Sequence, residues 1–439
     1  MITRIQVQGF KSLQSVDLNL GNLNLFVGTN ASGKSNFFDA LRVLQGIAYG
    51  FTIDEILNGK PKSATSDVWE QIRGGSEKAD FILRGGEGTL PSEKVIELGV
   101  SLPVQSPLTA ALDARKLPIE FTTGRYLGPP PVKYSIGISA KEGCVRREHL
   151  SVGDQLIFDS ADLNNTSQSP VIKVRYNAGW SSHWQDKRVF GDEYKLEFAK
   201  SRPVLHQLAA HENCSDTDRM LIQWCLKELS NTQRIDPSPA ILRDYSRAHI
   251  VKRMGDRGEN FAGLIGAIQS DEKTKAAYLS WLKQLTPTEL DDVTVLKGAL
   301  GEPLFAIKEK GMDFPAPILS DGTLRFAAIT AAFFQPDMPE LLTIEEIENG
   351  IHPSRLRLLV ELLRSQASRS TQVMATTHSP VVLAWLTPDD YRSTFLCSRD
   401  SETGASKIVP LSEVPNLVKI VGKQSLGDLF AEGWLEEAS

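Results

Sequence analysis

Residues 23–41 read Leu-Asn-Leu-Phe-Val-Gly-Thr-Asn-Ala-Ser-Gly-Lys-Ser-Asn-Phe-Phe-Asp-Ala-Leu. The apolar start of this stretch predicts a short buried strand, and the apolar run at its end predicts a helix. Between them, GTNASGKS at 28–35 matches the pattern GxxxxGK[ST] in full, in the strand–loop–helix order that a phosphate-binding loop requires. In such a loop, successive N–H groups and the positive end of the following helix attract phosphate oxygens. The stretch therefore predicts a P-loop nucleotide site.

The residues of this loop have distinct expected roles. Lys34 is expected to reach the β- and γ-phosphates, and the Ser35 hydroxyl is expected to hold Mg²⁺. Glycines at both ends of the loop allow the tight turns that bring the backbone close to an anion. The residues predicted to bind the nucleotide are Gly28, Asn30, Ala31, Ser32, Gly33, Lys34, Ser35 and Asn36.

The composition is that of an ordinary globular protein. The chain has 439 residues, of which 41% are hydrophobic and 23% are charged. At about 100–200 residues per domain, this length allows two or three structural lobes. The net charge of 48 − 54 = −6 argues against a surface that is basic throughout. A local basic groove for nucleic acid stays possible.

The sequence also indicates where the protein works. Its four cysteines are scattered, with no CxxC pair, so we expect neither a zinc site nor a disulfide framework. The N-terminus alternates like a strand and has no apolar signal block. No stretch approaches the roughly 18 apolar residues of a membrane span. We therefore expect a cytoplasmic protein that does not enter a membrane.

The periodic patterns predict an α/β fold built around a P-loop head. The head has a mixed sheet with flanking helices and an antiparallel part at its N-terminus. A β-rich lobe and a helical insertion interrupt the head. The expected segments are the first half of the head in 1–60, the β-rich lobe in 61–203, the helical insertion in 204–290, the second half of the head in 291–390 and a tail in 391–439.

Two carboxylates follow a buried strand in the second half of the head. The apolar run 341–344 leads directly into Glu345 and Glu346. This is the Walker B arrangement, in which the first carboxylate holds the Mg²⁺ shell and the second polarises the attacking water as general base. The usual first residue is Asp, and Glu345 is a longer variant that still permits contact with the metal through water. Glu346 is the predicted catalytic base.

A histidine and a helix start complete the predicted site. A second buried strand, 372–377, ends at His378, where an imidazole can hydrogen-bond the γ-phosphate. Upstream, a polar turn precedes an apolar helix, with a serine as the expected N-cap and a glycine that leaves the helix start open to an anion. This second predicted contact with nucleotide consists of Ser320, Asp321, Gly322 and Thr323.

Several features allow two interpretations. Lys11 either lies near the nucleotide or is a solvated turn lysine. The loop-like segment 177–203 carries Trp180, Trp184, Phe190, Tyr194, Lys187 and Arg188, with Arg175 beside it. These residues could stack on bases and neutralise phosphates, but a surface loop with inward tryptophans is the favoured interpretation.

Other segments are equally open. The basic stretch 242–253 is more typical of a solvated face than of a DNA-binding surface. The apolar residues of the tail either dock a partner or cap the last helix. They are Leu429, Phe430, Trp434 and Leu435.

Five motifs in this order resemble the ABC-type ATPases of the SMC/RecF class. They are FKS at 10–12, GTNASGKS at 28–35, LSDGTLR at 319–325, IEEIENGIHP at 344–353 and TTHSP at 376–380. The chain is similar, more narrowly, to the ATPase domain of the overcoming-lysogenization-defect (OLD) family and to related ATPase subunits of bacterial defence systems. The resemblance covers roughly residues 1–60 and 293–390.

The resemblance implies ATP and Mg²⁺ as cofactors and a division of labour between two subunits. In such ATPases the LSDGT motif contacts the γ-phosphate bound by the opposite subunit, so Ser320 to Thr323 would act in trans in a homodimer. Arg325 would support that loop or the phosphate. These ATPases also carry a glutamine that senses Mg²⁺, for which Gln71, Gln105 and Gln155 are candidates.

OLD proteins carry a TOPRIM nuclease domain after the ATPase. Only 439 − 378 = 61 residues follow His378, and they contain no DxD pair, so we expect no such nuclease chemistry in this chain. The sequence therefore favours an ATP-hydrolysing homodimeric switch that controls a separately encoded, nuclease-like effector in antiphage defence. The alternatives are a RecF-like DNA-repair ATPase that clamps DNA and an ATP-binding scaffold with little turnover.

Overall fold

The structure is a computed structural model that describes residues 1–61, 69–82, 95–103, 130–160, 169–178, 192–247, 251–285, 290–367, 371–421 and 423–437. Internal contacts divide the chain into two units, each assembled from separate segments. The first unit comprises Met1–Leu20, Ala31–Asn231 and Ser398–Ile408. The second comprises Gly21–Asn30, Thr232–Cys397 and Val409–Ser439.

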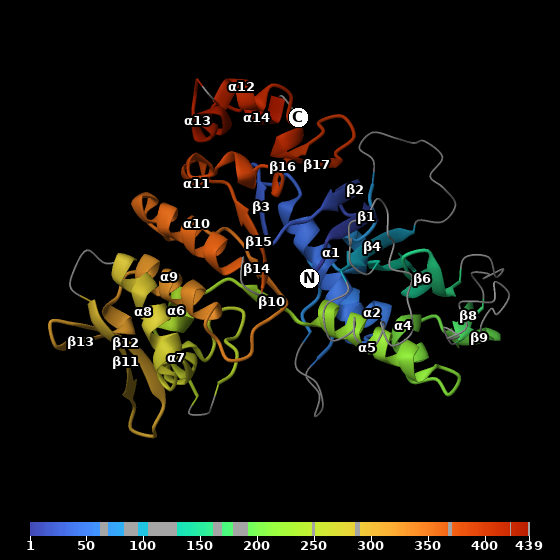
Figure 1. The fold of residues 1–439 in the computed structure, drawn as a ribbon, viewed down its shortest axis with the longest axis horizontal. Helices are drawn as coiled ribbons and strands as arrows, with labels where there is room; N and C mark the ends of the chain where they lie inside the picture. Colours follow the sequence, from blue (N-terminus) through green and yellow to red (C-terminus); the bar gives the residue numbers. More distant parts are fainter. Residues whose placement is uncertain are drawn as a thin grey trace, which may run out of the picture. The chain divides into compact units, whose positions relative to one another are not determined.

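The main sheet of the second unit is parallel over most of its width (Figure 1). In the described part of the chain it has six strands, in the order β10-β14-β15-β3-β16-β17. The first five pair in parallel. The strands are β3 (Leu23–Val27), β10 (Thr232–Ile235), β14 (Leu341–Ile344), β15 (Gln372–Thr377), β16 (Thr394–Arg399) and β17 (Ser406–Pro410). Every residue of β14 and β15 is buried, as expected for strands covered on both faces.

The register of this sheet places three strand ends at one edge. Val27 pairs with Thr377, and Ile344 pairs with Ala375. Because the three strands are parallel, the residues that follow them leave the sheet on the same side. In open α/β sheets, this carboxyl edge is where ligands bind.

Helices and a small antiparallel sheet complete the core of the second unit. The sheet has the order β11-β12-β13. Helices α7, α8 and α9 pack with one another, and α7 and α8 also pack on its strands. Their bounds are β11 (Leu290–Lys297), β12 (Pro303–Glu309), β13 (Met312–Pro315), α6 (Pro239–Leu242), α7 (Phe261–Gln269), α8 (Glu272–Leu285), α9 (Asp321–Ala332) and α10 (Pro353–Ala367). Helix α10 contacts β3 and β15, so it covers the parallel sheet.

The tail belongs to the hydrophobic core of the second unit. It forms α12 (Leu417–Val421), α13 (Leu426–Ala431) and α14 (Trp434–Glu437), and α13 packs on α11 (Pro380–Ala384). Leu429, Phe430 and Leu435 lie in one buried cluster with Val27 and Leu383. These apolar side chains at the end of the chain therefore pack inside the second unit. Because they are buried, they offer little surface to which a partner protein could dock.

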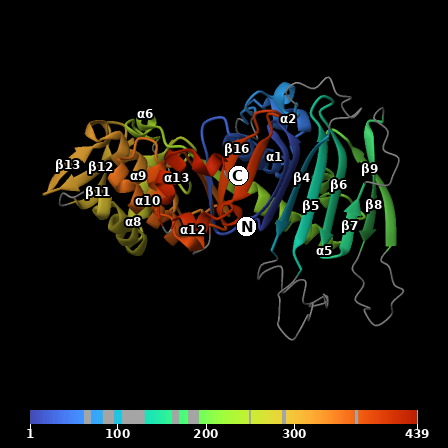
Figure 2. The same cartoon turned by 90° about the horizontal axis from the view of Figure 1, so that it is seen from above.

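An antiparallel sheet dominates the first unit, and its strands lie side by side in Figure 2. Among the described residues it has eight strands, in the order β2-β1-β4-β5-β6-β7-β8-β9. They are β1 (Arg4–Phe10), β2 (Leu13–Asn19), β4 (Ile96–Leu102), β5 (Val132–Ser139), β6 (Cys144–Val152), β7 (Gln155–Asp159), β8 (Val171–Ala178) and β9 (Asp192–Ala199). The N-terminal strands and the predicted β-rich lobe are thus one sheet.

Strand β9 corrects the prediction of a loop across 177–203. Tyr194, Leu196 and Phe198 alternate with polar residues, which is the pattern of a half-buried strand. Tyr194 lies opposite Tyr176 of β8, and their rings stack with centroids 6.2 Å apart. Tyr194 therefore packs in the sheet and is not part of a nucleic-acid loop. The segment 179–191, with both tryptophans of that hypothesis, lies outside the described residues.

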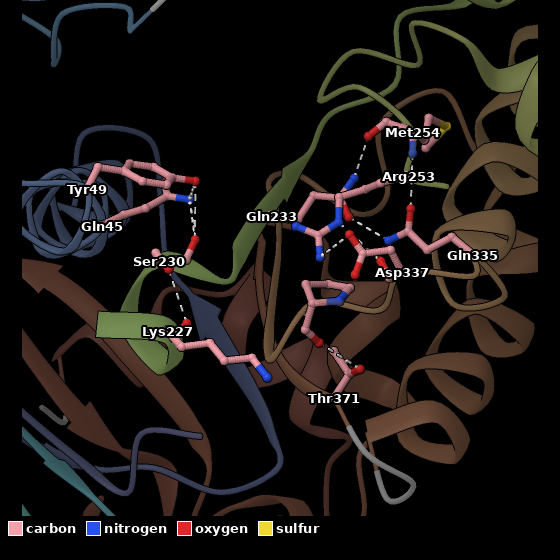
Figure 3. Close-up of polar contacts among 11 residues, drawn as sticks. Gln45, Tyr49, Lys227, Ser230, Gln233, Arg253, Met254, Gln335, Asp337 and Thr371 are labelled. Carbon is pink, nitrogen blue, oxygen red and sulfur yellow. Dashed lines mark hydrogen bonds and ion pairs between the residues drawn. The ribbon is translucent and has the colours of Figure 1, made fainter. Parts of the chain in front are cut away.

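In the described residues of the first unit, four α-helices accompany this sheet. They are α1 (Lys34–Ala48), α2 (Ile53–Asn58), α4 (Val204–Ala209) and α5 (Asp216–Ser230). Helix α1 packs along α5. Gln45 Nε2 and the Tyr49 hydroxyl both donate to the Ser230 carbonyl at the end of α5, at 3.2 and 3.3 Å (Figure 3).

Strand β10 corrects the prediction that 204–290 is helical throughout. Its four residues lie between α5 and a proline-rich turn, too few to show a periodic signal, and they pair with β14. Buried Gln233 fixes this edge strand (Figure 3). It donates to the Met254 carbonyl at 2.7 Å and accepts from Gln335 Nε2 at 2.5 Å. The predicted insertion therefore contributes a strand to the head.

Candidate nucleotide-binding site

The P-loop joins β3 to α1, and the chain passes from the second unit to the first between Asn30 and Ala31. Gly33 is the N-cap of α1 and has φ +107°, a value that side chains disfavour. A Cβ on Gly33 would also lie 2.1 Å from Ser406 Oγ. Ala31 has φ +66°. The loop thus has the sharp, glycine-dependent turn that its sequence predicts.

Two serines, Ser12 and Ser406, form hydrogen bonds beside the first turn of α1. The Ser406 N–H donates to the Ser12 carbonyl at 2.7 Å, and the Ser406 hydroxyl donates to Ser12 Oγ at 2.7 Å. Asn36 Nδ2 in turn donates to Ser12 Oγ at 2.7 Å. Sequence analysis did not identify Ser406, because a single serine on a C-terminal strand carries no local signal for contact with residues near position 12.

The start of α1 fits an anionic ligand. No side chain caps this helix, and its first turn contains no acidic residue, so nothing in that turn competes with a phosphate. Lys34 is buried, as is Ser32, whose Oγ has no hydrogen-bond partner among the described residues. A buried hydroxyl without a partner is costly and points to a ligand contact. Ser35 and Asn36 are partly exposed, while Asn30 and Ala31 are exposed.

A pocket of about 320 Å³ opens beside the first turn of α1, within the first unit. Its lining includes Lys11, Ser12, Asn36, Arg73, Lys78 and Arg399, together with Glu77 and Asp80. The basic side chains outnumber the acidic ones, which suits a phosphorylated ligand.

Lys11 is not the solvated turn lysine that one interpretation predicted. Its side chain is 6% exposed, and its Nζ lies 2.5 Å from Asp39 Oδ2 on α1. Burial lowers the pKa of Lys11, while the hydrogen bond to Asp39 opposes that shift. Arg73 Nε also pairs with Asp39, at 3.4 Å. Lys11 lines the pocket, and its contact with nucleotide stays a prediction.

The Walker B carboxylates leave the edge of the parallel sheet in a strained turn. Glu346 has φ +48°, which is rare for a residue with a side chain and is typical of functional sites. Its N–H donates to Thr376 Oγ1 of β15 at 2.8 Å, which holds the turn. The Glu346 side chain is exposed. Glu345 Oε1 lies 3.2 Å from Arg234 Nε on β10.

His378 follows β15 at the same edge. Its side chain is about half exposed, and its Nδ1 lies 2.9 Å from Glu348 Oε1. The His378 N–H donates to the same oxygen at 2.7 Å. Glu348 is part of the motif at 344–353, but the sequence alone gives no role for it. The structure thus brings Glu345, Glu346, His378 and the start of the P-loop to one sheet edge.

The turn at 320–323 begins α9 as predicted. Ser320 Oγ accepts from the Thr323 N–H at 3.2 Å, which is an N-cap contact. Ser320 and Asp321 are exposed, and Gly322 and Thr323 are partly exposed. A Cβ on Gly322 would lie 2.6 Å from the Gly350 carbonyl oxygen, so this glycine allows α9 to approach the turn after β14.

Arginines support that turn from within the second unit. Arg325 is buried and donates to the Pro237 carbonyl at 2.7 Å, so it supports α9. Arg243 Nη2 lies 2.5 Å from Asp321 Oδ1 and donates to the Leu319 carbonyl at 2.9 Å. Arg253 pairs with Asp337. Two arginines of the basic stretch 242–253 are therefore engaged within the chain, which weakens its interpretation as a DNA surface.

The predicted Mg²⁺-sensing glutamine is not resolved by the geometry. Gln71 is exposed and lies in the first unit, and Gln155 starts β7. Gln105 lies outside the described residues. The choice among these three residues stays a prediction.

Comparison with known proteins agrees with this geometry. Residues 1–82 match the family described as AAA ATPase domain. Residues 296–384 match the family described as AAA domain, putative AbiEii toxin, Type IV TA system. A relative from Helicobacter pylori (strain ATCC 700392 / 26695), named ATP/GTP phosphatase, is 21% identical over 388 residues, which cover 86% of this chain and 85% of the relative.

Solved structures of SMC heads are also similar. A SmcHead bound to the C-winged helix domain of ScpA has a TM-score of 0.48 at 14% identity, covering 95% of this chain and 99% of that one. The SMC head domain from Thermotoga maritima has a TM-score of 0.41 at 12% identity, covering 93% and 98%.

The strand–loop–helix site and the carboxylates at the edge of a parallel sheet define a P-loop nucleotide-binding protein. The two family matches, one at each half of the head, are both to AAA-type ATPase domains, and they show an ATPase. None of the helices in the described residues combines the length and apolar character needed to cross a membrane.

Proposed function

We propose that this chain is a Mg²⁺-dependent, ATP-hydrolysing homodimeric switch that acts as the sensor subunit of a bacterial antiphage system. The observation that carries the proposal is the shared edge of β3, β14 and β15. The pairing of Val27 with Thr377 and of Ile344 with Ala375 puts the start of the P-loop, the two Walker B glutamates and His378 after neighbouring parallel strands, at one edge. In this proposal, that edge carries the first residues of the P-loop, the base and the contact with the γ-phosphate.

Each residue has a chemical role in this proposal. Lys34 and the N–H groups at the start of α1 bind the phosphates. Glu346 takes the proton of the water that attacks the γ-phosphorus, and His378 donates a hydrogen bond to a γ-phosphate oxygen. The exposed, strained position of Glu346 suits a base that must reach water.

The metal would be shared between protein and substrate. Among the described residues, no group of three or more His, Cys, Asp or Glu side chains could hold a metal ion. Mg²⁺ commonly uses one or two protein oxygens together with substrate phosphates, and the hydroxyl of Ser35 and the carboxylate of Glu345 are the oxygen donors we assign. When bound, the ion neutralises charge that develops on the phosphates.

The homodimer follows from the division of labour in the sequence. The chain has one P-loop and one LSDGT turn, and Ser320 and Asp321 of that turn are exposed. In the proposed dimer, residues Ser320 to Thr323 contact the γ-phosphate held by the other subunit. ATP then joins two heads, and hydrolysis separates them.

The link to defence is supported by the second family match, whose description includes a putative AbiEii toxin, and by the motifs shared with the OLD family. We propose that the ATP state of the dimer controls a separately encoded effector with nuclease-like chemistry.

The test is the Glu346→Gln variant, purified from the native host with Mg²⁺-ATP. We expect it to bind ATP, to lose hydrolysis by about 100-fold or more, and to form a stable dimer that copurifies with a nuclease-like protein. The matched control is the Lys34→Ala, Glu346→Gln double variant, which should stay monomeric. Wild-type turnover by Glu346→Gln would refute the assignment of the base.

Other outcomes of this experiment would change the function. A monomer at saturating ATP would refute the homodimer. Nucleic acid as the copurifying component, without an effector, would favour a RecF-like clamp on DNA. Tight ATP binding with no hydrolysis by the wild-type protein would favour an assembly scaffold.

A further inference from the structure

Glu348 makes two contacts to His378 through one oxygen. Its Oε1 accepts the His378 N–H at 2.7 Å and lies 2.9 Å from Nδ1 of the ring. The Glu348 side chain is 10% exposed, whereas the His378 side chain is 47% exposed. A nearly buried carboxylate therefore fixes both the backbone and the ring of a histidine that reaches solvent.

The contact decides which nitrogen of the ring is presented. A carboxylate oxygen only accepts hydrogen bonds, so the nitrogen that faces it carries a proton. Nδ1 then donates its proton to Glu348, and Nε2, on the far side of the ring, is left for another partner. Nε2 accepts a hydrogen bond in the neutral ring and donates one only when the ring takes up a second proton. Carboxylates that fix the orientation and tautomer of a functional histidine in this way are common behind metal-binding and catalytic histidines.

The turn that carries Glu348 is attached to the same strand as His378. The Glu346 N–H donates to Thr376 Oγ1 at 2.8 Å, and the Ile347 N–H donates to the Thr376 carbonyl at 3.1 Å. The turn closes on itself through the Asn349 N–H, which donates to the Glu346 carbonyl at 2.9 Å. The proposed base and His378 therefore belong to one hydrogen-bonded assembly at the end of β15.

Glu348 also makes fewer hydrogen bonds than a buried carboxylate with a purely structural role normally does. Its Oε2 is buried and has no hydrogen-bond partner among the described residues. A buried oxygen without a partner costs about 1–3 kcal/mol. Such groups persist chiefly where they serve function, because a neutral or apolar residue would be cheaper for packing alone.

We propose that Glu348 is a positioning residue that holds His378 with Nε2 directed toward the γ-phosphate of the bound nucleotide. There the ring takes up a second proton from solvent and donates its Nε2–H to a phosphate oxygen. This inference rests on the proposed function, because it takes the γ-phosphate as the partner of His378. It adds that hydrolysis depends on Glu348 only through His378.

The first test needs no nucleotide. With ¹⁵N-labelled histidine, the seven histidines of the chain give a simple spectrum, and His378→Ala assigns the relevant signals. We expect wild-type protein to show the Nδ1-protonated form of His378. Glu348→Ala should shift it toward the Nε2-protonated form, and Glu348→Gln, which keeps an acceptor oxygen, should shift it less. An unchanged His378 signal in Glu348→Ala would overturn the proposal.

The second test is a double-mutant cycle in steady-state ATP hydrolysis. We expect Glu348→Ala to lower kcat by about 10- to 100-fold, the usual loss for a partner that orients a functional histidine, with little change in KM. His378→Ala should lose a similar amount. The double variant should be no slower than His378→Ala alone, because the effect of Glu348 passes through the ring. Glu348→Gln should retain more activity than Glu348→Ala.

The outcomes separate this proposal from the proposed function. If the two losses multiply, Glu348 acts independently of His378 and the positioning role is wrong. If Glu348→Ala shifts the His378 signals but His378→Ala hydrolyses ATP normally, the γ-phosphate role of His378 is refuted, and the positioning role in catalysis falls with it. Thermal midpoints of all variants show whether any loss reflects unfolding.

Discussion

Glutamates on the two large sheets are held in opposite ways. Glu148, on β6 of the antiparallel sheet, is fully buried and accepts from the Val204 N–H at 2.6 Å, the Leu205 N–H at 2.7 Å and the Tyr134 hydroxyl at 3.0 Å. At the edge of the parallel sheet, Glu346 has φ +48° and Glu348 keeps a buried oxygen without a partner in the described structure.

The difference separates a structural carboxylate from the two carboxylates that we assign to hydrolysis. Glu148 ties β6 to the start of α4, and each of its contacts serves the fold. The two edge glutamates carry backbone strain and an unsatisfied oxygen, which packing alone does not require. All three residues are glutamates, so residue type does not distinguish them. Whether their polar atoms have hydrogen-bond partners is the better indicator of function.

The largest effect should come from the lysine that follows the parallel strand β3. Replacing buried Lys34 with Ala removes the charge that we assign to the phosphates. Because truncating one partner of a buried charge pair costs about 2–5 kcal/mol, ATP affinity should fall by roughly 30-fold or more. Titration calorimetry measures this affinity. The control is Lys195→Ala, an exposed lysine of the antiparallel sheet, which should bind ATP normally. If Lys34→Ala and Lys195→Ala bound ATP with equal affinity, the role assigned to Lys34 would be wrong.

The second prediction concerns pH and the structural glutamate. Burial raises the pKa of Glu148 from 4.5 to about 7, against the opposing effect of its backbone hydrogen bonds. The native state therefore binds more protons than the unfolded state between these two values. The stabilisation is complete below pH 4.5 and is lost as the pH rises through about 7, with a total of about 3 kcal/mol.

Glu148→Gln should flatten this dependence. We would measure the free energy of unfolding in urea between pH 5 and pH 8 for both proteins. The wild-type protein should lose more stability across this range than the variant. The test is the difference between the two slopes, because the glutamine amide can change stability at every pH. Parallel slopes would contradict the assignment of a buried, titrating Glu148.

The third prediction tests the strained turn. Thr376 is buried and its hydroxyl accepts from the Glu346 N–H at 2.8 Å. Thr376→Val keeps the shape but removes the acceptor, and a buried donor without a partner costs about 1–3 kcal/mol. Because the turn then relaxes, kcat should fall while ATP affinity is retained. Thr376→Ser keeps the hydroxyl and is the control. If Val and Ser behaved alike, the strain at Glu346 would not matter for hydrolysis.

The sequence was sufficient to predict the local parts of this site. The P-loop turn, the strand before the two carboxylates and the N-cap at Ser320 all depend on neighbouring residues, and the structure shows each of them. The prediction of an ATPase is confirmed by the two family matches.

The parts that were missed depend on contacts between distant residues. Ser406 meets Ser12 across most of the chain, and Glu348 reaches a histidine that is 30 residues away. Strand β10 has four residues, too short to show a period, and its position follows only from pairing with β14. In β9, the alternation of Tyr194 with polar residues was present but was outweighed by the aromatic and basic residues before it.

The smallest effect on stability should come from ion pairs at the surface, and here the two regions can be compared directly. Arg243 pairs with Asp321 at 2.5 Å in the second unit, and Arg4 pairs with Asp17 at the same distance on the antiparallel sheet. All four side chains are at least one third exposed. Exposed pairs contribute about 0–1 kcal/mol, so neither arginine should matter much for folding.

Their effects on function should nevertheless differ. Arg243 also donates to the Leu319 carbonyl, so Arg243→Ala loosens the turn that we assign to the partner's nucleotide. We expect it to weaken ATP-dependent dimerisation in the Glu346→Gln background, measured by sedimentation, while ATP affinity and the thermal midpoint change little. Arg4→Ala should change none of the three. If Arg243→Ala left dimerisation unchanged, the contacts of Arg243 with the turn would not matter for binding the partner's nucleotide. The exposure of Ser320 to Thr323 would then be no evidence that this turn acts in trans. Backbone strain and unsatisfied oxygens at the sheet edge would then be the more reliable indicators of chemistry in this molecule.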